Sequence, residues 1–529
     1  MKSQNKNLVS RPPVVVVLGH VDHGKSSLLE AIPACNAVAT AGRKDFEITA
    51  KESGGITQHV GAYEVEHPSG PSGQVKKITF IDTPGHEAFS AIRARGAQVA
   101  DIAILVVDAA DAVQPQTKEA VAVIKKTGIP VIVALNKIDK PTADPEKIKR
   151  ELVKIDIIVE SMGGKIPSVE ISAKTKQGIN ELLELILLVA EMSDLKADIK
   201  APAEGVVIES FLDRLKGPVA TLIVTKGILN KKDIIGTSSV FAKIKNLEDF
   251  QGKPIEKAYP SQPVIVLGCE KCPGVGEKFR QYSTLEEAQQ NIKKAEAKEA
   301  PASVIALEPD QKILNVILKA DVLGSLEAIE GVLKNLPQEK VILRILKAEA
   351  GDINESDIKL AETSKSQIIG FRVKINPSVL QGFKKDKEKK VKIKTFDVIY
   401  NLIQEVRLMM EKALSPKVFR QDIGKVKTLV VFWGEGKRQI VGGKITEGEV
   451  RKGLKIEVFR PASKASRSDA GRDKEKKGEG KIINLQRNKK DVERLVKGDE
   501  CGILFEGNAK IQEGDILVFY TEERKKEEL

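Results

Sequence analysis

Apolar runs alternate with amphipathic stretches over residues 12–192 of this chain. Between the runs lie helical patterns at Glu87–Gln98, Thr117–Thr127 and Ile179–Glu191. The runs themselves are of strand length and nearly continuous, at Pro13–Leu18, Lys77–Ile81, Ile102–Asp108, Val131–Leu135 and Ser168–Ile171. This alternation predicts a parallel sheet with helices on both faces. A ligand is therefore expected at the carboxyl ends of the strands.

Three further regions follow a short linker at 193–203. Short strands broken by Gly and Pro predict a small β-barrel over residues 204–282. Strand and helix patterns alternate again over residues 300–395, which predicts a smaller α/β domain. Strands and glycines return over residues 421–525 and predict a second barrel. Within it, residues 461–480 are charged and rich in Ser and Gly, so we expect a mobile loop there.

Residues 396–414 carry apolar side chains at helical spacing and predict a helix of about five turns. It is either a rigid spacer between domains or a helix packed on the preceding domain. The abrupt end at Leu414-Ser-Pro416 favours the spacer. The predicted fold is therefore multidomain, α/β and β: a phosphate-loop domain, a β-barrel, a small α/β domain, a connecting helix and a C-terminal barrel, after a short polar tail at 1–11.

The composition shows an excess of positive charge and few cysteines. Lys and Arg number 86 against 74 Asp and Glu, a net charge of +12. This excess fits a polyanionic partner such as RNA, or merely a well-solvated surface. Four cysteines in 529 residues indicate a reducing compartment, and the Cys269/Cys272 pair lacks the second pair that a zinc site needs. Without a long apolar stretch, we expect a cytosolic protein with no membrane partner.

Five motifs fall at the predicted strand ends, each suited to one part of a guanine nucleotide. A phosphate-loop pattern alone is weak evidence, but the ordered set predicts a GTP/GDP site. The motifs are Gly-His-Val-Asp-His-Gly-Lys-Ser at 19–26, Thr57, Asp-Thr-Pro-Gly at 82–85, Asn-Lys-Ile-Asp at 136–139 and Ser-Ala-Lys at 172–174.

The phosphate loop and its neighbours predict contacts to phosphates and Mg²⁺. Glycines let backbone N–H groups approach phosphate oxygens. The loop residues are Gly19, His20, Val21, Asp22, His23, Gly24, Lys25 and Ser26. Lys25 is expected on the β- and γ-phosphates and Ser26 on Mg²⁺. Asp82 would hold Mg²⁺ through a water, and Thr57 would complete the metal shell when GTP is present. Gly85 would meet the γ-phosphate, so that hydrolysis releases its loop.

The last two motifs predict the choice of base. The carboxylate of Asp139 can accept hydrogen bonds from guanine N1 and N2, and adenine lacks both donors in that arrangement. Asn136 and the stem of Lys137 are expected to brace the loop. A backbone N–H in the segment Ser172, Ala173 and Lys174 is expected near guanine O6.

His86 follows the Asp-Thr-Pro-Gly motif directly. It is predicted to orient the attacking water, the role that glutamine has in other GTPases. The alternative is a surface histidine at the start of a helix.

These motifs resemble bacterial translation initiation factor 2, a ribosome-dependent member of the translational GTPases. The resemblance rests on Arg11–Lys25, Gly54–Tyr63, Asp82–Phe89 and Arg93–Ala97, and continues in Leu314–Ala328 and Lys497–Gly502. It implies the same domain order as the pattern of strands and helices. It also implies that the family's usual long N-terminal extension is missing, so that any anchoring it provides is expected to be lost or replaced.

The resemblance implies that the terminal barrel holds the formylmethionyl end of initiator tRNA. The matching positions are Arg487, Glu500, Cys501 and Gly502. Cys501 would be a small apolar wall for the methionine side chain, or simply a core residue. Gly443 lies in a Gly-Gly-Lys segment where the family often has a second cysteine.

The resemblance implies a factor that places formylmethionyl initiator tRNA on the small ribosomal subunit, promotes subunit joining and hydrolyses GTP on the ribosome. Its expected partners are both ribosomal subunits and that tRNA, with no DNA, and we expect a monomer in solution. One alternative is an elongation-type GTPase that delivers other aminoacyl-tRNA. Another is an RNA-binding scaffold with a decayed GTPase, against which the intact Lys25, Asp82, His86 and Asp139 argue.

Overall fold

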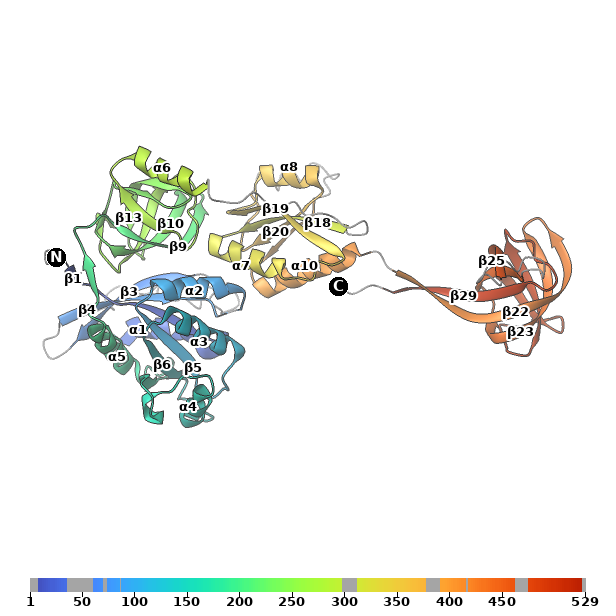
Figure 1. The fold of residues 1–529 in the computed structure, drawn as a ribbon, viewed down its shortest axis with the longest axis horizontal. Coiled ribbons are helices and arrows are strands. Elements are labelled where there is room, and N and C mark those ends of the chain that lie inside the picture. Colours follow the sequence, from blue (N-terminus) through green and yellow to red (C-terminus); the bar gives the residue numbers. More distant parts are fainter. Residues whose placement is uncertain are drawn as a thin grey trace, which may run out of the picture. The chain divides into compact units, whose positions relative to one another are not determined.

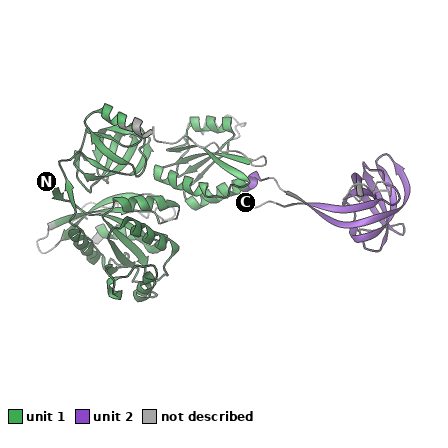
Figure 2. Ribbon diagram, in the orientation of Figure 1, with its two compact units in different colours: residues 1–410 green, residues 411–529 purple. Residues whose placement is uncertain are grey.

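A computed structural model describes residues 8–35, 60–69, 74–85, 87–296, 312–376, 391–414, 417–461 and 474–525. Thr57 and His86 lie outside these residues, so their predicted roles stay predictions. The chain divides into two compact units, Met1–Met410 and Glu411–Leu529 (Figures 1 and 2). Among the helices of the described ranges, none combines the length and apolar character that crossing a membrane requires.

The first domain is built on a six-stranded sheet in the order β3-β4-β2-β5-β6-β7. Five of its strands are parallel: β2 (Val14–Gly19), β4 (Gln74–Asp82), β5 (Ile102–Asp108), β6 (Val131–Asn136) and β7 (Ser168–Glu170). Every residue of β2 and β5 is buried, as their unbroken apolar sequences predict. The sequence did not predict the antiparallel edge strand β3 (Gly61–Ser69), which pairs with β4.

Helices cover both faces of this sheet, which confirms the predicted α/β layering (Figure 1). Side chains of α1 (Lys25–Cys35) and α5 (Ile179–Met192) pack on one face. Side chains of α2 (Ser90–Val99), α3 (Pro115–Thr127) and α4 (Pro145–Val153) pack on the other. The carboxyl ends of the parallel strands therefore meet at one edge, where the nucleotide motifs lie.

A short antiparallel pair joins the segment before this domain to the one after it. Strand β1 (Leu8–Ser10) pairs with β8 (Lys196–Asp198). Both segments were expected to be tail and linker. Strands of three residues are too short to show a periodic pattern, so they can be identified only from their pairing in the folded structure.

The first barrel closes through six strands in the order β12-β17-β9-β10-β16-β13, with β12 pairing β13. The strands are β9 (Glu204–Asp213), β10 (Gly217–Lys226), β12 (Ile234–Gly236), β13 (Phe241–Glu248), β16 (Pro263–Cys269) and β17 (Lys278–Tyr282). Short strands β11 (Leu229–Asn230), β14 (Pro254–Ile255) and β15 (Lys257–Ala258) lie in its loops. Helix α6 (Leu285–Glu296) follows the barrel.

The smaller α/β domain has a parallel sheet in the order β19-β18-β20-β21. Its strands are β18 (Lys312–Ala320), β19 (Val341–Ala350), β20 (Gln367–Phe371) and β21 (Ile393–Phe396). Its helices are α7 (Leu323–Lys334) and α8 (Glu355–Ser364), and a capping box of Asn354 and Asp357 starts α8. The predicted connecting helix is α10 (Ile399–Ala413), whose apolar side chains Ile399, Leu402, Val406, Met409 and Met410 are all buried. This burial favours the packed helix over the spacer.

The second unit is a barrel of six strands in the order β22-β29-β24-β25-β28-β23, closed by the pairing of β22 with β23. The strands are β22 (Lys417–Glu435), β23 (Arg438–Arg451), β24 (Lys455–Pro461), β25 (Lys474–Arg487), β28 (Glu500–Gly507) and β29 (Ile516–Lys525). Strands β26 (Lys490–Asp491) and β27 (Arg494–Val496) are short.

The expected mobile loop at 461–480 is wrong for its last part. Strand β25 already begins at Lys474, which pairs with Pro461 on β24. The start of β25 is charged and shows no apolar pattern, and Lys476, Lys477 and Glu479 are exposed. Its strand structure comes from pairing with β24. Residues 462–473 lie outside the described residues.

Candidate nucleotide-binding site

The predicted phosphate loop runs from the end of β2 through a short 3₁₀ turn, η1 (Val21–His23), to the start of α1. Two of its glycines have no room for a side chain. A Cβ on Gly19 would lie 2.3 Å from the carbonyl oxygen of Val106, and one on Gly24 would lie 2.5 Å from Asn136 Nδ2. Gly24 also has a φ of +86°, in the left-handed region that favours glycine. The loop is therefore held tightly against β5 and the loop after β6.

Lys25 is buried beneath this loop. Its Nζ donates hydrogen bonds to the carbonyl oxygens of Gly19 (3.0 Å) and His20 (2.7 Å). Burial lowers the pKa of Lys25 to about 8, although the nearby negative charge of Asp82 opposes the shift. A buried ammonium group at the start of a helix is a suitable partner for phosphate oxygens.

The Asp-Thr-Pro-Gly segment packs directly on the phosphate loop. Asp82 ends β4 opposite Val17 of β2 and is fully buried, and Thr83 Oγ1 donates to the carbonyl oxygen of Val17 (2.7 Å). A Cβ on Gly85 would lie only 2.5 Å from Lys25 Nζ and 2.9 Å from Val21. Gly85 is thus the point where this segment touches the lysine expected to hold phosphates.

Asn136 joins three of the predicted motifs. Its Nδ2 donates to the carbonyl oxygen of His23 (3.0 Å), in the phosphate loop. Its Oδ1 accepts from the backbone N–H of Lys137 (2.8 Å) and from that of Ala173 (3.1 Å). The predicted bracing role of Asn136 therefore has a geometry that links both base loops to the phosphate loop.

Asp139 and Ser172, both expected near the base, contact each other. Ser172 Oγ donates a hydrogen bond of 2.7 Å to Asp139 Oδ1, and this bond lowers the pKa of Asp139. Ser172 is fully buried, whereas Asp139 is exposed. The hydrogen bond to one oxygen orients the ionised carboxylate, and its exposure leaves it able to accept hydrogen bonds from the N–H groups of a base. Lys174 is exposed beside them.

Two residues that the motifs do not include also hold the site. Asp108, at the end of β5, forms ion pairs of 3.0 Å with Lys137 and with Lys140. Lys137 Nζ also donates to the carbonyl oxygen of Asp22. Gln116 Oε1 accepts from the backbone N–H of Val21 (3.1 Å). The sequence could have indicated Asp108, because it is an acidic residue at the end of a buried parallel strand. Gln116 could not have been found in this way, because glutamine is common in helices.

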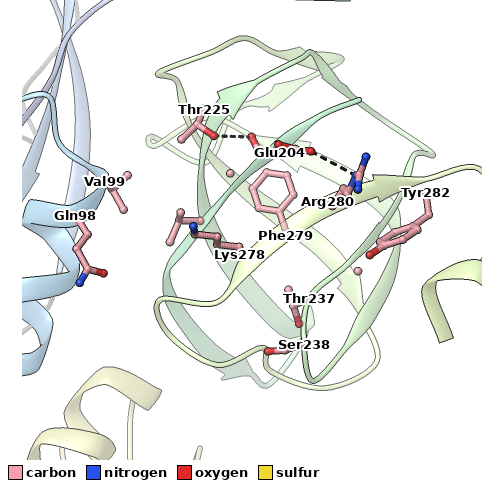
Figure 3. A pocket seen from close by; sticks show the side chains of 13 residues that line it. Gln98, Val99, Glu204, Thr225, Thr237, Ser238, Lys278, Phe279, Arg280 and Tyr282 are labelled. Carbon is pink, nitrogen blue, oxygen red and sulfur yellow. Dashed lines mark hydrogen bonds and ion pairs between the residues drawn. The ribbon is translucent and has the colours of Figure 1, made fainter. Parts of the chain in front are cut away.

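A hollow of about 860 Å³ lies elsewhere, beside strand β17 of the first barrel (Figure 3). Lys278, Arg280 and Tyr282 alternate along β17 with the buried Phe279, and Glu204 pairs with Arg280 (3.4 Å). None of the predicted nucleotide residues lines this hollow. It is therefore not the predicted GTP site.

Known proteins match the chain over nearly its whole length. Family models match at residues 11–192 (Elongation factor Tu GTP binding domain), 202–282 (Elongation factor G domain 2) and 281–407 (Translation-initiation factor 2). The protein named Translation initiation factor IF-2 from Thermotoga sp. (strain RQ2) is 40% identical, over 98% of this chain and 73% of that protein. The chain belongs to the translation initiation factor 2 family.

Other members of the translation initiation factor 2 family are longer than this chain. The chloroplastic member from Euglena gracilis is 42% identical over 97% of this chain, and the match covers 61% of that protein. In the member from Synechococcus sp. (strain JA-2-3B'a(2-13)), the match covers 48%. The chain thus spans about half to three-fifths of these relatives. Among solved structures, GDP-bound aIF5B from Aeropyrum pernix is 26% identical, with a TM-score of 0.44 over 97% of this chain and 92% of that one.

The family positions expected to hold formylmethionine divide between the two sides of the terminal barrel. Cys501 points inward: it is 5% exposed, lies in the barrel core, and its Sγ lies 3.4 Å from the carbonyl oxygen of Gly443. Burial raises the pKa of its thiol to about 12. Arg487 and Glu500 are exposed, and Arg487 pairs with Asp499 (3.1 Å). Gly502 is half-buried, and a Cβ there would lie 3.8 Å from Cβ of Gln486, in ordinary van der Waals contact. The geometry favours the core role for Cys501.

Proposed function

We propose that this chain is a GTP-dependent translation initiation factor. It binds formylmethionyl initiator tRNA, promotes its placement on the small ribosomal subunit and subunit joining, and hydrolyses GTP on the ribosome. The proposal places this work in the cytoplasm. It is supported by membership of the translation initiation factor 2 family and by the site at the edge of the first sheet.

The observation that carries the nucleotide part is the three-way hydrogen bonding of Asn136. A single side chain bonds to the phosphate loop at His23, to its own loop at Lys137 and to the third loop at Ala173. The loop expected to bind the phosphates and the loops expected to bind the base are thereby held at a fixed separation, as the binding of a single nucleotide requires. In this proposal Asp139 recognises guanine, and the segment around Lys174 lies near guanine O6.

The residues present also fit Mg²⁺. Asp82 places a fully buried carboxylate beside the buried ammonium of Lys25. We propose that the hydroxyl of Ser26 holds the ion directly and the carboxylate of Asp82 holds it through a water, with Thr57 as a further ligand. Carboxylate and hydroxyl oxygens are ligands that Mg²⁺ accepts. When bound, GTP and Mg²⁺ supply the phosphoryl group and neutralise its charge.

The protein's own part in hydrolysis is to orient water and to sense the γ-phosphate. We propose that His86 orients the water, since it directly follows Gly85 in the chain. Gly85 lies against Lys25 without room for a Cβ, so its segment depends on what occupies the space around the Lys25 ammonium. Loss of the γ-phosphate is therefore expected to release this segment.

Two measurements on the full chain test the proposed function. GTP turnover is measured with and without ribosomes, and we expect slow turnover alone and a large stimulation by ribosomes. Binding of initiator Met-tRNA is measured with and without the formyl group in the presence of GTP. A preference for the formylated form supports an initiation factor. Equal binding of both forms contradicts that role and favours an elongation-type factor, and absence of ribosome-stimulated turnover contradicts both.

A further inference from the structure

Asp108 is a buried carboxylate beside the predicted nucleotide site, and it belongs to none of the nucleotide motifs. It ends β5 opposite Asn136 of β6 and is 3% exposed. Its Oδ1 accepts a hydrogen bond of 2.8 Å from the backbone N–H of Ala110. Its Oδ2 pairs with the ammonium groups of Lys137 and Lys140, each at 3.0 Å. A buried charge requires partners of this kind, and here they hold both oxygens of the carboxylate.

Lys137 connects Asp108 to the phosphate loop. Besides its pairing with Asp108, the Nζ of Lys137 donates a hydrogen bond to the backbone carbonyl oxygen of Asp22. The stem of Lys137 also lies against this loop, since a Cβ on Gly24 would be 3.6 Å from Lys137 Cε. A single ammonium group therefore joins the end of β5 to the loop that is expected to bind the phosphates.

The backbone of Lys137 is in a conformation that needs support. Its φ of +65° lies in the left-handed region, which is unfavourable for a residue other than glycine. The backbone N–H of Lys137 donates to Asn136 Oδ1 (2.8 Å), and its carbonyl oxygen accepts from the N–H of Lys140 (3.1 Å). Asp108 holds the other end of the residue, at Nζ. Backbone strain of this kind persists where the surroundings hold a residue at several points.

Asp108 carries a negative charge at neutral pH. Burial alone would raise the pKa of its carboxyl, but the N–H of Ala110 and the ammonium groups of Lys137 and Lys140 lower this pKa below its usual value. Because the carboxylate is buried, dissolved salt screens its attraction for Lys137 less than it screens an ion pair at the surface. The contact between the two side chains is therefore charge-assisted under the conditions in which nucleotide binds.

We propose that Asp108 is a positioning residue for guanine-nucleotide binding, and that it acts by holding Lys137 against the phosphate loop. The inference rests on the proposed function and adds to it a residue outside the nucleotide motifs. The oxygens of Asp108 are engaged by Ala110 and the two lysines, so its effect on the nucleotide passes through Lys137. Without Asp108, Lys137 can leave its left-handed conformation, and the base loop has to be ordered again whenever a nucleotide binds.

Removal of the charge tests the inference in the full chain. Asp108→Asn keeps the size of the side chain and an oxygen for the N–H of Ala110, but it has no negative charge for Lys137. The affinities for fluorescent GDP and GTP should fall by the same factor, about 10- to 100-fold, mostly through faster release. The control Asp156→Asn removes an exposed ion pair with Lys125 in the same domain and should bind normally. Unaltered affinity and release in Asp108→Asn would overturn the inference.

A second substitution separates the positioning of Lys137 from a general effect on the fold. Lys137→Met keeps a long apolar stem but has no ammonium group for Asp108 to hold. In the Lys137→Met background, Asp108→Asn should change the release rate of GDP less than about twofold. An undiminished effect in this background would show that Asp108 acts on the fold or through Lys140, and the inference would be wrong. If Asp108→Asn does not fold, Lys137→Met alone decides: normal GDP release by this variant contradicts the inference.

Nucleotide binding by the unaltered protein distinguishes this inference from the proposed function. If the unaltered protein binds GDP and GTP and Asp108→Asn binds them as tightly, the inference fails and the proposed function stands. If the unaltered protein binds neither nucleotide, the proposed function and the inference fail together.

Discussion

Asn136 Nδ2 donates a hydrogen bond of 3.0 Å to the carbonyl oxygen of His23, although 113 residues separate them in the chain. This bond joins the loop after β6 to the phosphate loop after β2. A Cβ on the neighbouring Gly24 would lie 2.5 Å from the same nitrogen, so only glycine permits it. The predicted phosphate and base halves of the site are thus joined directly by this bond.

Asn136→Ala should therefore weaken GTP and GDP alike. The substitution leaves the buried carbonyl of His23 and the N–H of Ala173 without this partner, at a cost of about 2–4 kcal/mol. Affinity should fall roughly 30- to 1000-fold. Titration of fluorescent GDP measures it. Asn335→Ala, exposed at the end of α7, should bind normally, and near-normal binding by Asn136→Ala would contradict the bracing role.

Asp139→Asn should change the base preference from guanine to xanthine. The amide can no longer accept two N–H groups from guanine, but it can donate to the 2-carbonyl of xanthine. GTP affinity should fall about a hundredfold or more, since hydrogen bonds to a charged group are lost. XTP affinity should rise. Competition between GTP and XTP for the variant checks this, and an unaltered preference for GTP would remove Asp139 from base recognition.

Ser26→Ala should remove the dependence of nucleotide binding on Mg²⁺. In the unaltered protein, removal of divalent ions with a chelator should weaken GTP binding about tenfold or more, because the phosphate charge is no longer neutralised. The variant should bind GTP equally weakly with and without Mg²⁺. Ser27→Ala is the matched control, since its neighbouring exposed hydroxyl is not expected on the metal. Full Mg²⁺ dependence in Ser26→Ala would contradict the assignment.

His86→Ala should bind GTP normally and lose most ribosome-stimulated hydrolysis. A positioned group acting on water contributes on the order of 10²–10⁴ to the rate. Single-turnover hydrolysis on ribosomes measures the loss, with GTP affinity determined in parallel. His67→Gln, a histidine on β3 of the same domain, is a comparison that should keep its turnover. Turnover unchanged in His86→Ala means that the residue is only a surface histidine.

The smaller α/β domain should lose stability in acid through Asp357. Burial alone would raise the pKa of this carboxyl, but Lys347 Nζ (2.9 Å) and Lys319 (3.4 Å) lower it below its usual value. A carboxyl whose pKa is lower in the folded state stabilises the fold above its unfolded pKa, near 4, and this stabilisation is lost as pH falls through the folded pKa. Amide exchange in residues 312–376, corrected for intrinsic rates, should therefore accelerate below about pH 4.

Asp357→Asn tests the same ion pairs at neutral pH. Removal of one partner from a buried pair should destabilise the domain by about 3 kcal/mol. The difference from the unaltered protein should shrink below about pH 4, where the carboxyl of the latter becomes protonated. Glu330→Gln removes a surface pair with Lys334 and should cost less than about 1 kcal/mol at any pH. A constant deficit of Asp357→Asn across pH would contradict the linkage.

The domain order and most strands could be predicted from the sequence because their signals are local. The buried strands β2 and β5 are continuous apolar runs, and the motif residues Lys25, Asp82 and Asp139 lie where such strands end. By contrast, β1 and β8 are three residues each and pair across the chain. The charged start of β25 likewise owes its structure to β24. Local patterns cannot show pairings of this kind.

By itself, the sequence determined the ligand class and the order of the domains, because motif spacing and hydrophobic period are properties of short segments. Only the tertiary structure decided which side chains share a space. Strand register turned Cys501 into the core and Gly502 outward, and the meeting of three loops made Asn136 their common partner. A shift of one residue reverses every side chain of a strand, so these facts depend on the register and packing of the whole domain.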